Sequence, residues 1–183
     1  MHWTIIAGTN RSNSRTLLLS KFLQKELLAL TPEEDQIQLL DLKNLPTEIF
    51  SPEVYEKKPK AFEEFQACIS KTDAIISVLP EYNGSAPGAY KYFIDMLSFP
   101  ESLLKKPAAF VGLSAGKFGG VRAVEQMQQV FLYRKAYLFS ESLFIRDAES
   151  HIHADGSIVD SFLKTLCDQM LNGFIDFAKR LKD

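Results

Sequence analysis

The sequence has few cysteines, no long apolar run and no excess of charge of either sign. Its two cysteines, Cys68 and Cys167, lie far apart and lack metal-ligand spacing, so we expect two core thiols in a reducing compartment. No apolar run approaches the roughly 20 residues of a membrane-spanning helix, and no basic segment precedes the first apolar run. The 21 Lys and Arg residues against 23 Asp and Glu residues leave no basic surplus for nucleic-acid phosphates. These absences predict a soluble, cytoplasmic protein that binds neither a membrane nor nucleic acid.

Short apolar runs alternate with stretches of helical periodicity along the whole chain. The 183 residues are 46% hydrophobic, which predicts a single domain, residues 1–183, with one sizeable core. Buried strands are expected over 3–7, 37–42, 74–79 and 107–113, and in two short pieces over 136–139 and 143–145. Helices are expected over 14–30, 61–70, 87–97 and 121–133, and from about residue 157 onward.

The last of these helices repeats apolar residues at helical spacing, and six of them are expected on one face: Phe162, Leu166, Met170, Phe174, Phe177 and Leu181. Strand and helix together alternate five times. This predicts an α/β fold of three layers, in which a flavodoxin-like, five-stranded parallel sheet of order 2-1-3-4-5 carries helices on both faces.

The loop after the first strand, residues 8–16, combines hydroxyls, amides and two guanidinium groups with no carboxylate. It opens a helix, whose first N–H groups are unpaired and whose dipole adds partial positive charge. Thr9 and Ser14 can donate to phosphate oxygens and Arg11 can make a two-pronged contact, so the loop favours a phosphomonoester site. The alternative is an ordinary capped helix start, with Ser14 as the N-cap and Arg11 in solvent.

Two further loops follow the third and fourth strands. Residues 80–88 bring together an aromatic ring, an amide and closely spaced Gly and Pro, which is typical of a stiff loop that lies against a flat heterocycle. Residues 114–120 contain three glycines, which indicates positive backbone angles or close approach of another group. A plain turn and plain flexibility are the respective alternatives. Because ligands of parallel sheets bind beyond the carboxyl ends of the strands, all three loops are expected to form one site.

Three short motifs occur in these loops in a fixed order. Residues 8–14 match G-S-x-R-x-x-S, with Thr9 in place of Ser. Residues 80–91 match P-E-Y-N-x-S-x-P-G-x-L-K, with Tyr90 in place of Leu, and residues 119–123 match G-G-x-R-A. In these motifs the chain resembles the NADPH-dependent FMN reductases, flavodoxin-like proteins that include quinone, azo-dye and chromate reductases. The second motif is the specific one of the three.

The resemblance implies a set of FMN contacts and an activity. The phosphate would be held by Thr9, Arg11 and Ser14, with help from Asn13 and Thr16. One side of the isoalloxazine ring would be lined, partly through backbone N–H groups, by Pro80, Glu81, Tyr82 and Asn83. The other side of the ring would be covered by Ser114, Gly116 and Gly119. The expected activity is hydride transfer from NAD(P)H through bound FMN to a small acceptor such as a quinone or flavin. The cofactor carries this chemistry, so no side chain is expected to act as a catalytic acid or base.

The resemblance also implies homodimers or homotetramers that form through the third and fourth helices. These segments carry Tyr92, Phe99, Phe131 and Tyr133, more aromatic residues than one buried stripe requires.

Other functions on the same fold remain as alternatives. One is a flavin-binding electron carrier, or a redox-responsive partner protein, with negligible turnover. A receiver-type signalling domain needs an acidic cluster after the first strand, and residues 8–16 contain none. His151 and His153 have the spacing of metal ligands on an extended segment, but Asp155-Gly156 marks a turn there, and no metal site is expected.

Overall fold

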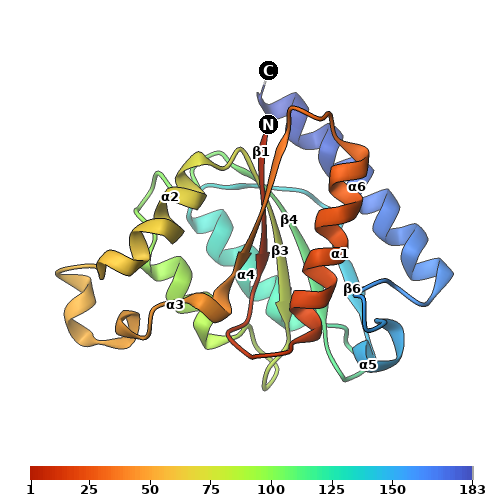
Figure 1. The fold of residues 1–183 in the computed structure, drawn as a ribbon, viewed down its shortest axis with the longest axis horizontal. Coiled ribbons are helices and arrows are strands. Elements are labelled where there is room, and N and C mark those ends of the chain that lie inside the picture. Colours follow the sequence, from red (N-terminus) through yellow and green to blue (C-terminus); the bar gives the residue numbers. More distant parts are fainter. Residues whose placement is uncertain (183) are drawn as a thin grey trace.

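A single parallel β-sheet forms the centre of the molecule (Figure 1). The computed structural model describes residues 1–182. The strands are β1 (His2–Ala7), β2 (Gln36–Asp41), β3 (Ala74–Pro80), β4 (Pro107–Leu113), β5 (Tyr137–Leu138) and β6 (Leu143–Ile145), in the order β2-β1-β3-β4-β5, and β6 also pairs with β4. The predicted flavodoxin-like order is therefore confirmed. The fifth strand position of the sheet is shared by β5 and β6, because β5 pairs with the start of β4 and β6 pairs with its end.

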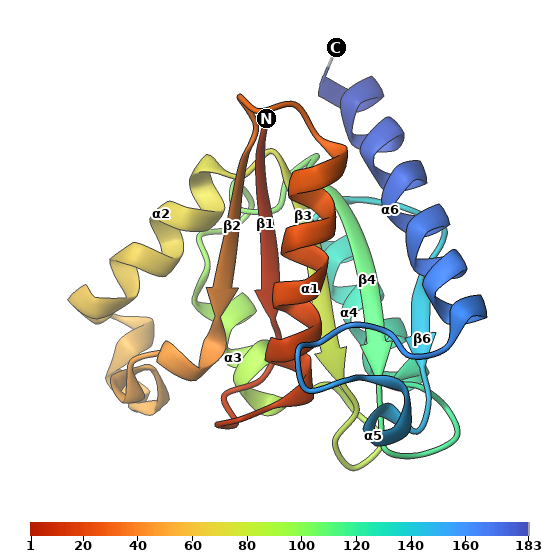
Figure 2. The same ribbon diagram turned by 45° about the vertical axis from the view of Figure 1, so that its right-hand side comes forward.

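Helices cover both faces of the sheet, as expected. On one face lie α1 (Arg15–Leu30) and α6 (Ser161–Lys182), and on the other lie α2 (Glu63–Lys71), α3 (Gly88–Met96) and α4 (Val121–Tyr133) (Figure 2). Alternate residues of β3 reach opposite layers: Ile76 and Val78 pack under α1 and α6, whereas Ile75 and Leu79 pack under α3 and α4. Because both faces are covered, all seven residues of β3 are buried, which explains the continuous apolar runs in the sequence.

The segment between the sheet edge and α6 differs from the prediction. The last helix begins at Ser161 rather than near residue 157, and a short helix, α5 (Ala148–His151), precedes it. Residues 157–160 are extended, because Ile158 forms an antiparallel bridge with Ile152. The Asp160 carboxylate then accepts a hydrogen bond from the Leu163 N–H at 2.8 Å and starts the helix there. The stretch after β2 contains several prolines and is irregular, with four 3-10 turns between Leu42 and Phe62.

The buried face of α6 is also different from the predicted one. Phe162 is 68% exposed and Leu181 is 43% exposed, whereas the buried residues are Cys167, Met170, Leu171, Phe174, Ile175 and Ala178. A row of residues four apart drifts by about 40° per step, because the helix has 3.6 residues per turn. Phe162 and Phe174 therefore point about 120° apart and do not lie on one face. Among residues 1–182, no helix is long and apolar enough to cross a bilayer.

The start of α3 packs tightly onto the ends of β1 and β3. The Tyr90 ring is fully buried, and its hydroxyl is 2.6 Å from the Ser77 Oγ on β3. Burial raises the pKa of the Tyr90 phenol well above its usual range, so it stays protonated and hydrogen bonded. A Cβ on Gly8 would lie 2.9 Å from this ring and 2.7 Å from the Val78 carbonyl oxygen, so only glycine fits there. The tyrosine at the position where the family motif has Leu is thus accommodated by a serine beneath it.

Replacing Tyr90 by Phe should lower the free energy of unfolding by about 1–3 kcal/mol, because it leaves the buried Ser77 hydroxyl without this partner. Urea denaturation measures the change. Tyr92→Phe is the matched control: Tyr92 is 37% exposed on the same helix, and we expect a change within about 0.5 kcal/mol. Equal stability of the two variants would show that the Ser77–Tyr90 hydrogen bond contributes nothing.

Candidate functional site

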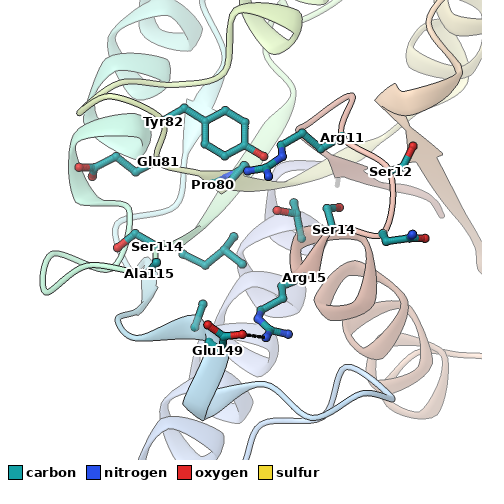
Figure 3. Close-up of a pocket in the computed structure, with 14 residues that line it drawn as sticks. Arg11, Ser12, Ser14, Arg15, Pro80, Glu81, Tyr82, Ser114, Ala115 and Glu149 are labelled. Atoms are coloured by element: carbon teal, nitrogen blue, oxygen red, sulfur yellow. Dashed lines mark hydrogen bonds and ion pairs between the residues drawn. The ribbon is translucent and has the colours of Figure 1, made fainter.

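A pocket of about 490 Å³ opens at the carboxyl edge of the sheet, where the predicted loops meet (Figure 3). Its walls come from the loops after β1, β3 and β4, and also from α5 after β6. Of the predicted contacts, Arg11, Asn13, Ser14, Thr16, Pro80, Glu81, Tyr82 and Ser114 line it; Thr9, Asn83, Gly116 and Gly119 are not among the lining residues. Of the other lining residues, Ser12, Arg15 and Ala115 belong to the predicted loops, whereas Leu113, Ala148 and Glu149 lie outside them.

The N-terminus of α1 faces the pocket. The Ser14 Oγ accepts a hydrogen bond from the Leu17 N–H at 3.1 Å, so Ser14 is the N-cap of the helix. The N–H groups of Arg15 and Thr16 precede the first intrahelical hydrogen bond and have no partner within the helix. Ser14 therefore caps the helix, as one of the two alternatives held, and it also lines the pocket. The helix end offers N–H donors and a partial positive charge to an anion.

Thr9 joins the first loop to the second. Its side chain is 1% exposed, and its Oγ1 lies 2.8 Å from the Tyr82 hydroxyl and 3.2 Å from the Arg11 N–H, from which it accepts. The Arg11 guanidinium lies 5.4 Å from the centre of the Tyr82 ring, and the two side chains point toward each other (Figure 3). Thr9 thus orients the loop that carries Arg11, and the Thr9 side chain is buried beneath this loop.

Asn83 has a backbone role in the second loop. Residues 82–85 form a two-residue turn, in which Tyr82 N–H donates to the Ser85 carbonyl oxygen at 2.9 Å and Ser85 N–H donates back at 3.0 Å. Asn83 and Gly84 have φ angles of 52° and 72°, and positive values at both central positions are typical of an Asn-Gly type I′ turn. Some of the backbone N–H groups that were expected to contact the ring are bonded within the protein, since the Glu81 N–H donates to the Leu113 carbonyl oxygen at 3.0 Å.

The first turns of α4 hold the second loop in place. The Glu81 carboxylate, which is 10% exposed, accepts from the Arg122 guanidinium at 2.9 Å and from the Arg122 N–H at 3.3 Å. Four residues further along the helix, the Gln126 side-chain oxygen accepts from the Ser85 hydroxyl at 2.9 Å and from the Ala86 N–H at 3.1 Å. The loop is therefore tied to α4 at both of its ends.

The third loop is shaped by its three glycines, none of which lines the pocket. The Ser114 hydroxyl donates to the Gly116 carbonyl oxygen at 2.9 Å, and the Ser114 N–H donates to the Ile145 carbonyl oxygen at 3.1 Å. Gly120 has a φ of 86°, and a Cβ there would lie 2.5 Å from the Leu113 nitrogen. The glycines thus allow close backbone approach, as predicted, and place Ser114 and Ala115 against the pocket.

The fourth wall was not predicted. The Glu149 carboxylate on α5 pairs with the Arg15 guanidinium at 2.8 Å across the pocket (Figure 3). β6 is parallel to β4, so the segment after it also begins at the carboxyl edge; this topology was the available signal. Both acidic residues of the pocket are paired with arginines, whereas Arg11 forms no ion pair within residues 1–182. The pocket therefore offers one free guanidinium beside a helix N-terminus.

Comparison with known protein families agrees with this geometry. The family model for NADPH-dependent FMN reductase matches residues 1–150, which include all three loops and α5 up to Ser150. The chain belongs to the NADPH-dependent FMN reductase family. The expectation of an FMN-dependent oxidoreductase that uses NAD(P)H is thereby confirmed.

Individual relatives and a solved structure support the same assignment. An NAD(P)H-dependent FMN reductase of Pseudomonas aeruginosa is 33% identical over 181 residues, which cover 97% of this chain and 95% of the relative. A 2-hydroxy-1,4-benzoquinone reductase of Burkholderia sp. is 30% identical and covers 90% of this chain and 91% of the relative. The structure of a flavoenzyme NAD(P)H:(acceptor) oxidoreductase from Paracoccus denitrificans aligns with a TM-score of 0.78 at 25% identity, covering 98% and 97% of the two chains.

The residues of the pocket fit the cofactor of this FMN reductase family. A phosphate dianion suits the free Arg11 guanidinium and the N–H donors of α1, and a flat ring suits the stiff loop that carries Pro80 and Tyr82. The volume of about 490 Å³ lies within the range of roughly 300–1,000 Å³ that is usual for small-molecule sites. Among residues 1–182, no three His, Cys, Asp or Glu side chains are arranged to hold a metal ion.

Substitution of Asn83 separates a backbone role from a ring contact. Asn83→Ala replaces a residue that tolerates positive φ by one that disfavours it, and we expect it to lower the free energy of unfolding by about 1 kcal/mol and to weaken FMN binding. Asn83→Gly keeps the turn and should change neither quantity by more than a small amount. Urea denaturation and quenching of FMN fluorescence measure the two effects. Equal loss of FMN affinity in both variants would instead place the Asn83 amide against the ring.

Proposed function

We propose that this protein transfers hydride equivalents from NAD(P)H to a quinone-type acceptor, with FMN held in the pocket at the carboxyl edge of the sheet. The observation that carries the proposal is a free arginine and a helix N-terminus on one side of the pocket, with a rigid aromatic loop on the other. The relatives named as quinone reductases, including a 2-hydroxy-1,4-benzoquinone reductase and an NADPH:quinone oxidoreductase of Arabidopsis thaliana, support the choice of acceptor.

In this proposal each wall of the pocket has one task. The phosphate is held by Arg11, by the Ser14 and Thr16 hydroxyls and by the N–H groups at the start of α1. Asn13 lies beside these groups. Pro80 and Tyr82 flank the ring, and Ser114 and Ala115 close the other side. Thr9 and Asn83 support these walls: Thr9 contacts the Tyr82 hydroxyl, and Asn83 allows the turn that follows Tyr82. FMN supplies the hydride chemistry when it is bound, and the chain supplies orientation and electrostatics.

The remaining expectations concern the whole chain. We propose that residues 1–183 form one FMN-binding domain, which the two core layers on a single sheet support. We also propose a cytoplasmic location, where NAD(P)H is available as the reductant. Two thiols support it: Cys68 and Cys167 are buried and unpaired with each other, and burial raises the pKa of the Cys167 thiol to about 12.

Arg11→Ala tests the phosphate contact and the function together. We expect the Kd for FMN to rise roughly tenfold or more, because a hydrogen bond to a charged group contributes about 1.5–3 kcal/mol. Binding of riboflavin, which has no phosphate, should be unchanged, and Arg11→Lys should recover part of the FMN affinity. The wild-type protein should show flavin absorption and oxidise NAD(P)H in the presence of menadione. Flavin binding without turnover would support the electron-carrier alternative, and an unchanged Kd would remove Arg11 from the site.

We propose further that the protein forms a homodimer through α3 and α4. A groove of about 790 Å³ runs between these helices, and its rim carries Phe99 and Tyr133, which are 56% and 75% exposed and have ring centres 6.0 Å apart. Phe131, which was expected to add to this surface, is fully buried in the core. Lys91 and Asp95 on α3 pair at 2.7 Å along the groove, and a two-fold axis would let them exchange partners between subunits. A second copy of the chain is therefore the occupant that we propose.

Light scattering on the purified protein tests the dimer. We expect a mass of twice 20.7 kDa at micromolar concentration. Tyr133→Glu should shift the mass toward the monomer, because it places an unpaired charge in the interface. Tyr55→Glu is the matched control, since Tyr55 is 70% exposed on a 3-10 turn outside the groove. A wild-type monomer, or two variants with the same mass as wild type, would reject α3 and α4 as the interface.

A further inference from the structure

A second pocket lies directly beside the first. It has a volume of about 280 Å³ and is called here the flanking pocket. Its wall includes Lys117 and Phe118 from the loop after β4, Phe144 on β6, Arg146 and His151 around α5, and Phe162 at the start of α6. Neither the FMN contacts nor the dimer groove uses these six side chains.

Two chain segments, residues 115–117 and 149–151, form the wall between the two pockets. Ala115 lines the FMN pocket and Lys117 lines the flanking pocket, so their Cα atoms are no more than about 7 Å apart along the chain. Glu149 and His151 are related in the same way on α5. The two segments are joined by a hydrogen bond from the Ala148 N–H to the Ser114 carbonyl oxygen at 2.9 Å. A ligand that extends out of the FMN pocket over this wall enters the flanking pocket.

The flanking pocket combines exposed aromatic rings with positive charge. Phe118 and Phe162 are 58% and 68% exposed, so both rings present apolar surface to solvent at this pocket. The Arg122 guanidinium lies 4.3 Å from the centre of the Phe118 ring and is paired with Glu81, so this ring is fixed relative to the loop of the FMN pocket. Aromatic faces of this kind stack with nucleobases.

The charges of the flanking pocket favour a phosphate. Lys117 and Arg146 form no ion pair within residues 1–182. Asp160 also lines the pocket, but its carboxylate accepts the Leu163 N–H and caps α6. Two free cationic side chains beside aromatic rings match a purine nucleoside that carries a phosphate group.

We propose that the flanking pocket binds the adenosine 2′-phosphate end of NADPH, with Lys117 and Arg146 on the phosphate and the phenylalanine rings on the adenine. This inference rests on the proposed function, since it assigns a place to part of the nicotinamide nucleotide. NADH has the same adenine but lacks the 2′-phosphate. Lys117 and Arg146 are therefore specificity-determining residues that make the protein prefer NADPH over NADH.

The double variant Lys117→Gln/Arg146→Gln tests the proposal in two ways. With FMN-loaded enzyme and menadione, the ratio of kcat/KM for NADPH to that for NADH should fall at least tenfold. In calorimetry without turnover, adenosine 2′,5′-bisphosphate should bind wild-type protein more tightly than adenosine 5′-monophosphate does, and the variant should lose this difference. The matched control Lys25→Gln/Arg180→Gln removes the same charge from exposed positions outside both pockets and should leave both quantities unchanged.

Several results would overturn the proposal. It fails if the NADPH to NADH ratio of the double variant equals that of wild type, if the control lowers the ratio equally, or if the two adenosine phosphates bind wild-type protein alike. Phe162→Ala should weaken both nucleotides together, and a selective loss of NADPH would contradict the role of the ring. A wild-type protein that oxidises neither nucleotide would refute the proposed function, and the calorimetry would still decide whether the flanking pocket holds a 2′-phosphate.

Discussion

Parallel pairing of β1, β3 and β4 is the constraint on which the rest of the structure depends. Ala7 pairs with Val78, and Pro80 pairs with Leu113, so the three strands end close together and their loops begin at one edge of the sheet. The loops then bond to one another: the Thr9 hydroxyl to the Tyr82 hydroxyl, and the Glu81 N–H to the Leu113 carbonyl oxygen. A shift of one residue in this pairing would turn buried side chains to the opposite layer and separate these partners.

The architecture and the position of the site could be read from the sequence because both depend on local patterns. Strands buried on both faces are continuous apolar runs such as 74–79, and the helices between them carry clear stop signals such as Thr31-Pro32. Once strand and helix alternate, the order of the sheet and the edge that binds ligands follow from general rules of α/β folds. These rules suffice to place Arg11 and Ser14 at the pocket, because both residues follow a strand that ends at this edge.

The roles that sequence reasoning missed depend on contacts between distant segments. Thr9 has the chemistry of a phosphate ligand, yet its burial beneath Tyr82 makes it a support for the loop. Asn83 has the chemistry of a ring contact, yet its positive φ places it at the first central position of the type I′ turn. Glu149 lies 134 residues from Arg15, and no local pattern indicates their ion pair. The exposed start of α6 was missed for a different reason, since spacings of four residues drift around a helix.

The ion pair between Arg15 and Glu149 has a consequence for both pockets. Side chains that are 37% and 83% exposed hold each other weakly, so an anion that reaches Arg15 can displace the carboxylate at little cost. The four-residue helix that carries Glu149 also carries His151, which lines the neighbouring pocket. Any movement of this short helix would therefore change the walls of both pockets at once. The segment after the last strand thus supplies residues to both the cofactor pocket and the adjoining surface.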